Sequence, residues 1–130
     1  MHGEAYDTLP ATMTTREIGA LRLGAVPVTV EPKAAELLAQ LRPEALDAVL
    51  SGVREWAEHA PVKCARLTYD LDPEATFWEQ AIIEIDVEAD TDQAFDLWED
   101  VGAALEGIES RLPAADRDWL LDHFDVHLHW

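Results

Sequence analysis

The sequence predicts an α+β domain with two layers, in which a small mixed sheet of three or four strands carries helices packed on one face. Two patterns predict it. Apolar residues recur at intervals of three and four over 32–57 and 92–110, as in amphipathic helices, and they alternate with polar residues over 62–69, 77–88 and 123–130, as in half-buried strands. The chain has 130 residues, 48% of them hydrophobic, so we expect a single domain over 1–130. Residues 1–12 show no periodicity and are expected to form an N-terminal arm.

The first elements after this arm are short. Thr14 to Glu17 fits a capping box, and Gly19 follows so soon that the helix must be brief. Valines then alternate with other residues over 26–30, which predicts a short strand. Pro27 favours a place at the edge of the sheet, because proline cannot donate to a ladder of hydrogen bonds.

Two successive helices are predicted next. Pro32 and Pro43 suit their first positions, where a missing backbone N–H costs nothing. Each helix has one apolar face, comprising Ala34, Leu37, Leu38 and Leu41 in the first and Leu46, Val49, Leu50, Val53 and Trp56 in the second.

The second half of the chain begins with a predicted hairpin of strands 62–69 and 77–88, joined by a wide polar loop. A helix over 92–110 follows, with Thr91 as its cap. Its apolar stripe includes Phe95 and Trp98, which are therefore expected in the core. Pro113 starts another short helix, and the strand 123–130 ends the sequence. The path from the second hairpin strand to this last strand suits a parallel crossover.

The charge is concentrated in the same half of the chain. The protein has 27 acidic and 9 basic residues and a formal net charge of −18. Residues 67–130 hold 18 acids and 2 bases, whereas residues 33–66 hold 5 of each. Adaptation to salt would spread acid over the whole surface, so the division favours a local acidic face. Such charge also disfavours direct nucleic-acid binding, which needs a basic surface.

The compartment expected from composition is the cytoplasm. Cys64 is the only cysteine, so no internal disulfide can form, and a lone thiol suits a reducing environment. No run of 18 apolar residues is present, so no membrane span is expected. The first residues are polar and slightly acidic, unlike a secretory signal.

The last predicted strand has the most specific pattern. Its odd positions, His123, Asp125, His127 and His129, should share one face, because side chains alternate along a strand. The hairpin strand should add acidic side chains to that face. The candidate acidic sheet face is therefore Glu84, Asp86, Glu88 and Asp125.

Three kinds of chemistry could use this face. His127 and His129 lie about 7 Å apart along a strand and, with Asp125, could hold a divalent metal, although a solvated strand face explains them as well. Histidines beside carboxylates could instead act as a pH switch. Cys64 could be a nucleophile if a histidine lay within hydrogen-bond reach. No cofactor is otherwise expected.

The function that these observations favour is a non-catalytic interaction module, in which the acidic half binds a basic partner protein. An antitoxin, an immunity protein or a nucleic-acid mimic would be of this kind. The sequence has no glycine-rich phosphate loop, no Gly-x-Ser-x-Gly and no His-Glu-x-x-His motif. The alternatives are a metal-dependent enzyme or metal carrier that uses His127 and His129, and a structural protein that forms a homodimer through a sheet edge.

Overall fold

The computed structural model describes residues 15–75 and 78–130. The arm predicted at 1–12, the capping residue Thr14 and the first residue of the predicted strand 77–88 lie outside these ranges. Within them, the elements in chain order are α2 (Thr15–Gly19), β1 (Arg22–Leu23), β2 (Val26–Val30), α3 (Pro32–Leu38), α4 (Pro43–Ala57), β3 (Val62–Leu71), β4 (Glu79–Val87), α5 (Thr91–Glu109), α6 (Ala114–His123) and β5 (Phe124–His129). The predicted α+β class is confirmed.

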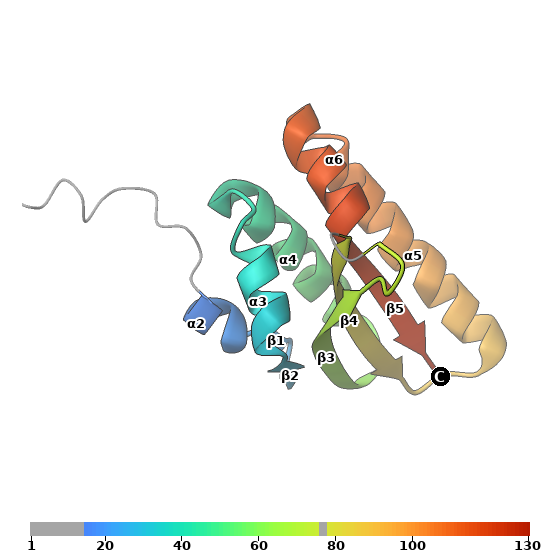
Figure 1. The fold of residues 1–130 in the computed structure, drawn as a ribbon. Helices are drawn as coiled ribbons and strands as arrows, with labels where there is room; N and C mark the ends of the chain where they lie inside the picture. Colours follow the sequence, from blue (N-terminus) through green and yellow to red (C-terminus); the bar gives the residue numbers. More distant parts are fainter. Residues whose placement is uncertain (1–14, 76–77) are drawn as a thin grey trace, which may run out of the picture.

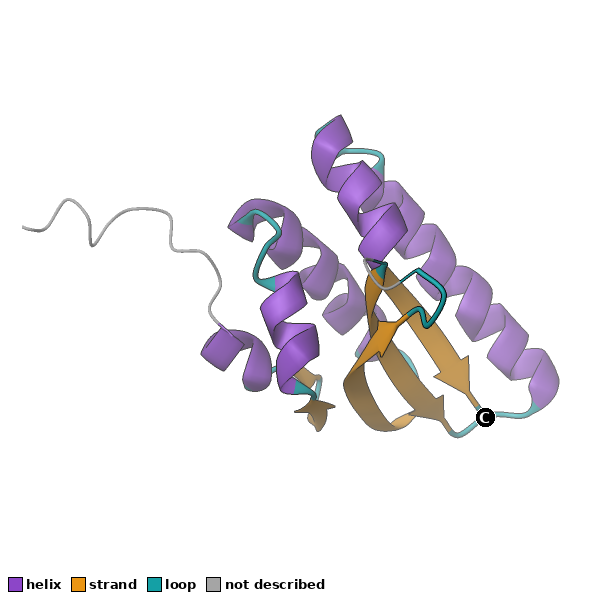
Figure 2. Ribbon diagram, viewed as in Figure 1, coloured by secondary structure: helices purple, strands orange, loops and turns teal. Residues whose placement is uncertain are grey.

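The sheet has five strands in the order β1-β2-β3-β4-β5, rather than three or four (Figure 2). The strand that prediction missed is β1, whose two residues are too few to show a period of two. The sheet is mixed, as expected: β1 with β2 and β3 with β4 are antiparallel, whereas β2 with β3 and β4 with β5 are parallel. The predicted hairpin and the predicted parallel pairing of its second strand with the last strand are both confirmed.

The position of β2 corrects one prediction. Pro27 favoured an edge, but β2 lies between β1 and β3. The ladder to β3 begins only at Val28, paired with Ala65, so the missing N–H of Pro27 costs no hydrogen bond between these strands. Val28 itself donates its amide to the carbonyl of Leu21, on the β1 side.

The starts of the helices follow local rules. Pro32 and Pro43 occupy the first turns of α3 and α4, as predicted. The predicted cap of α5 is wrong by one residue, because the side chain of Asp90 accepts a hydrogen bond from the Gln93 amide at 2.8 Å and Thr91 is already helical.

The core lies between the helices and the inner face of the sheet. This face carries the buried residues Ala65 and Leu67 of β3, Ala81, Ile83 and Ile85 of β4, and Phe124, Val126 and Leu128 of β5. Helix α3 packs on β3 and β4, and its four buried residues belong to the same core cluster as the buried stripe of α4. Along β5, buried and exposed residues alternate without exception, so the opposite face of that strand is open to water.

Few side chains of helix α5 are fully buried against the rest of the domain. Only Ala94 and Val101 of its 19 residues are buried. Gly52 of α4 lies against Ile108 of α5, and a Cβ at Gly52 would collide with the end of that side chain, so the glycine allows the two helices to approach. The prediction that Phe95 and Trp98 belong to the core is wrong, because these side chains are 50% and 53% exposed.

The end of the chain is held to the first half by one buried carboxylate. Asp116, in the first turn of α6, is buried, and its Oδ2 accepts hydrogen bonds from Nη2 and Nε of Arg42 at 2.6 and 2.9 Å. Arg42 precedes α4, so this pair links the start of α6 to the start of α4.

Replacement of Ile83 by alanine tests this packing. Ile83 is fully buried at the centre of the sheet, and the change should lower the free energy of unfolding by about 2–5 kcal/mol. Guanidinium unfolding followed by tryptophan fluorescence measures it. The control Leu121→Ala, on an exposed residue of α6, should cost no more than about 0.5 kcal/mol. Equal costs for the two variants would contradict this placement of the core.

Candidate functional site

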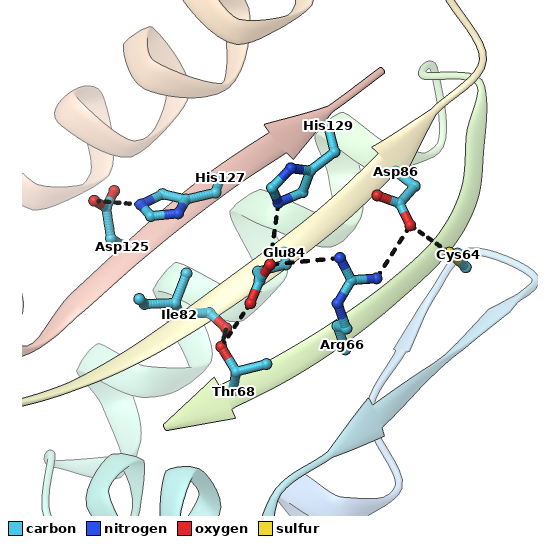
Figure 3. A network of polar contacts seen from close by, with 9 residues as sticks. All are labelled: Cys64, Arg66, Thr68, Ile82, Glu84, Asp86, Asp125, His127 and His129. Atoms are coloured by element: carbon cyan, nitrogen blue, oxygen red, sulfur yellow. Dashed lines mark hydrogen bonds and ion pairs between the residues drawn. The ribbon is translucent and has the colours of Figure 1, made fainter. Parts of the chain in front are cut away.

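The polar face of the sheet brings together residues from three strands (Figure 3). Cys64, Arg66 and Thr68 come from β3, Glu84 and Asp86 from β4, and Asp125, His127 and His129 from β5. The strand register aligns Arg66 with Glu84, Glu84 with His127, and Asp86 with both Cys64 and His129. Three of the four predicted acidic residues therefore lie on this face, as expected from the alternation.

Arg66 occupies the centre of this face. Its Nη1 lies 3.1 Å from Oδ2 of Asp86, and its Nη2 lies 3.4 Å from Oε1 of Glu84. One guanidinium thus joins two carboxylates that would otherwise repel each other (Figure 3). The acidic character that the sequence predicted for Glu84 and Asp86 is consequently reduced by a cation from the neighbouring strand.

The pKa values of these carboxyl groups reflect the same contacts. The Thr68 hydroxyl donates to Glu84 Oε2 at 2.9 Å, and this hydrogen bond, with Arg66 and His129, lowers the pKa of Glu84 despite partial burial. The pKa of Asp86 is lowered by hydrogen bonds from Cys64 and Arg66. Both groups are therefore ionised at neutral pH and contribute to stability in that state.

Glu88 and Asp125 lie outside the Arg66 network. Glu88 follows the last residue of β4 and is exposed, with its backbone amide bonded to the carbonyl of Pro61. Asp125 accepts a hydrogen bond from the amide of Val126 at 2.8 Å, and its other oxygen lies 3.2 Å from Nε2 of His127. These two acids are at the periphery of the polar face.

The two histidines of β5 contact different carboxylates. Nε2 of His127 lies beside Asp125, whereas Nε2 of His129 lies 3.1 Å from Oε1 of Glu84 (Figure 3). In residues 15–75 and 78–130, no group of three or more His, Cys, Asp or Glu side chains is arranged to hold a metal ion. The metal hypothesis for His127, His129 and Asp125 therefore gains no support from the geometry and stays a prediction.

His123 is not on this face. It was expected as the first residue of the last strand, but α6 continues through His123 and β5 begins at Phe124. Its ring packs against Trp119 with centroids 4.9 Å apart, and its Nδ1 lies 2.7 Å from the carbonyl of Glu79. The alternating pattern therefore predicted the start of the strand one residue too early. A helix can pass directly into a strand without an intervening turn, so no turn residue marked the boundary.

Cys64 has the wrong neighbour for a nucleophile. The thiol is exposed and donates a hydrogen bond to Oδ2 of Asp86 at 2.7 Å. This hydrogen bond raises the pKa of Cys64, so the thiolate is disfavoured. The hypothesis required a histidine within hydrogen-bond reach of the thiol, but His129 contacts Glu84 instead.

Sequence reasoning missed an aromatic pocket beside β5. It has a volume of about 280 Å³ and is lined by Phe95, Trp98, His127, Leu128 and Trp130. The rings of Phe95 and Trp130 are tilted, with centroids 5.8 Å apart, and both side chains are about half exposed. The apolar stripe of α5 already contained Phe95 and Trp98. The sequence alone does not show how much of that stripe the neighbouring elements cover.

Helix α5 has a group of acidic side chains with no base on the same helix. This helix contains Asp92, Asp96, Glu99, Asp100, Glu106 and Glu109 and no lysine or arginine. All but Glu109 are exposed. The half-buried Glu109 has a raised pKa, first through desolvation and then through repulsion by Glu106 and by Asp125 of β5. Acidic side chains of α5 and β5 therefore crowd together at one end of the pair.

Comparison with known proteins does not narrow the function. No protein-family model matches the sequence, and neither the curated proteins nor the solved structures give a significant match. None of the helices in the described ranges is long and apolar enough to cross a bilayer.

The contact between Cys64 and Asp86 can be tested by alkylation. Asp86→Asn should make Cys64 react faster with iodoacetamide near pH 8, because loss of the carboxylate lowers the pKa of the thiol toward its ordinary value. Glu84→Gln removes the same charge from a residue that does not contact Cys64, and it should change the rate much less. Equal rates for all three proteins would show that Asp86 does not hold the thiol.

The lowered pKa of Glu84 predicts a pH dependence of stability. Because the folded pKa lies below the unfolded value of about 4.5, the stabilisation is present above that pH and is lost as the pH falls through the folded pKa. Thr68→Val removes the main cause of the shift. The difference in unfolding free energy between this variant and wild type should be largest at pH 7 and should close in acid. Urea unfolding between pH 7 and pH 2 measures it, and a difference independent of pH would contradict the assignment.

Proposed function

We propose that the protein is a non-catalytic interaction module that binds a basic partner protein, as an antitoxin, an immunity protein or a nucleic-acid mimic would. The observation that carries this proposal is the net charge of −16 in residues 67–130, together with the six acidic residues and absence of lysine and arginine on α5. Opposite charges steer association and select partners, so a partner with a basic surface suits this half of the chain.

The surface proposed for the partner is the side of the molecule formed by α5 and β5. Five of the six carboxylates of α5 are exposed, and that helix contains no lysine or arginine. In contrast, Glu84 and Asp86 already share Arg66. We assign these two acids a supporting role, in which they and Glu88 extend the negative field across the sheet face.

The electrostatics of Glu109 support this choice. Its carboxyl group is half-buried beside Glu106 and Asp125, and its pKa is raised by that environment. A lysine or arginine from a partner would relieve the repulsion among these three groups. Binding energy is therefore available at a place where the free protein is electrostatically unfavourable.

Two charge-reduced variants test the proposal. The first carries Glu99→Gln, Glu106→Gln and Glu109→Gln on α5, and the control carries Glu36→Gln, Glu55→Gln and Glu58→Gln on the exposed surfaces of α3 and α4 and the residue after it. Both lose three charges. Basic proteins retained by each from a lysate of the native host are identified by mass spectrometry at about 0.05 M and about 0.5 M salt.

Wild type and the control variant should retain the same basic protein at low salt and release it at high salt. The α5 variant should associate at least about tenfold more slowly with that protein once it is purified. The proposal fails if no basic protein is retained at low salt. It also fails if the two variants weaken binding equally, because the effect would then come from net charge alone.

A further inference from the structure

The sheet ends at a strand that has an open side. β5 is the last strand in the sheet order, and β4 is its only strand partner in the described part of the chain. No strand in the described part of the chain pairs with the outer side of the six-residue β5, although the amide of Val126 already donates to Oδ1 of Asp125 and the amide of Phe124 to the carbonyl of Leu120. Such edges are templates for another extended segment.

Helix α5 is wide enough to pack against one more strand placed beside β5. A helix is about 10–12 Å wide with its side chains and strands are spaced about 4.8 Å apart, so one helix can cover two strands. α5 runs along the outer side of β5 (Figure 1). Its Phe95 and Trp98 side chains line a pocket with Leu128 and Trp130 and are still half exposed. A sixth strand would cover these aromatic side chains.

The aromatic pocket lies at one end of this vacant position. Phe95 and Trp98 form one side of it and Trp130 the other, and the nearly buried Leu128 reaches it from β5. The volume of about 280 Å³ is larger than one leucine or valine side chain and would admit it together with part of its neighbour. Aromatic pockets of this kind hold the residues that dominate binding at protein interfaces.

The acidic cluster lies at the other end. Phe95, Trp98, Gly102, Glu106 and Glu109 follow one another at intervals of three and four, so they share one face of α5. Glu109 at the far end of this face interacts with Asp125 of β5, whereas Phe95 at the near end contacts Trp130. This face of α5 thus passes from aromatic to acidic along its length, and Gly102 between the two parts leaves open space where a side chain would be.

We infer that an extended basic segment of the partner adds to β5 as a sixth strand, places an apolar side chain among Phe95, Trp98 and Trp130, and sets lysine or arginine near Glu106, Glu109 and Asp125. This inference rests on the proposed function and names the surface that performs it. Charge complementarity selects the basic segment over a second copy of this chain, because pairing two β5 edges would bring together two chains of net charge −18.

Nuclear magnetic resonance of the full-length ¹⁵N-labelled protein tests the inference. The probe is the acetylated, amidated heptapeptide Lys-Val-Arg-Leu-Lys-Val-Arg, titrated at low and high salt. A second peptide has serine in place of the central leucine. Two more peptides carry N-methyl groups on the odd or on the even residues, which removes one alternate set of backbone donors and keeps every charge.

Strand addition predicts a specific result. The parent peptide should shift the amides of residues 124–130 and the indole signals of Trp98 and Trp130 at low salt. Because alternate residues of a strand point their N–H groups to opposite sides, one N-methylated peptide should lose binding and the other should keep it. The serine peptide should bind about tenfold more weakly, as should the parent peptide to Trp98→Ala, whereas the matched control Leu121→Ala on exposed α6 should bind normally.

Other outcomes overturn the inference. If both N-methylated peptides bind as the parent does, with shifts confined to α5, charge recognition stands and strand addition is wrong. If no peptide binds at low salt, strand addition is also wrong, and the proposed function is decided by the charge-reduced variants alone. If the β5 signals instead move with protein concentration in the absence of peptide, the occupant of the edge is a second copy of this chain.

Discussion

β4 must pair with β3 on one side and with β5 on the other while it keeps Ile83 and Ile85 in the core. Because side chains alternate along a strand, this requirement sends Glu84 and Asp86 to the opposite face. The same register brings Arg66 between them and His129 beside Glu84. A one-residue slip of β4 would bury both carboxylates and expose the isoleucines, so the core and the polar network specify the same register.

This network also decides where the surface charge remains. Arg66 is shared by two carboxylates of the sheet, and α5 contains six acids with no base of its own. α5 is buried only at Ala94 and Val101, so its acidic side chains and two of its aromatic residues stay accessible. The two surfaces therefore differ: on the polar sheet face Arg66 partly neutralises Glu84 and Asp86, whereas α5 combines acidic side chains that have no base on the same helix with half-exposed aromatic side chains.

The periodicity of the sequence predicted most of the helices and strands, but not which of their side chains are covered by neighbours or form contacts. The α+β class follows from the alternation in β3, β4 and β5 together with the prolines that begin α3 and α4. The same alternation predicts the hairpin and the polar face. β1 has two residues and therefore no period, which is why the sheet is wider than expected. Trp98 lies on the apolar stripe of its helix. Such a stripe shows which side of the helix faces the domain, but not how many of its side chains the neighbouring elements cover. Arg66 lies on the same face by the alternation of β3, yet its bridging of Glu84 and Asp86 depends on side-chain conformation, which residue spacing does not specify.

The carboxylates and the aromatic pocket act over different ranges. This difference helps to explain how the edge of β5 can stay without a strand partner. Charges attract or repel over a Debye length of about 8–10 Å, whereas the pocket contributes only when water has left it. A second copy of the chain meets repulsion from α5 before its own edge can reach β5, while a basic segment is drawn along the same field. Under the proposed function, the same acidic side chains would both oppose self-pairing and attract the basic partner. On this view Phe95 and Trp98 can remain half exposed because the charge beside them restricts which surfaces come close enough to cover them.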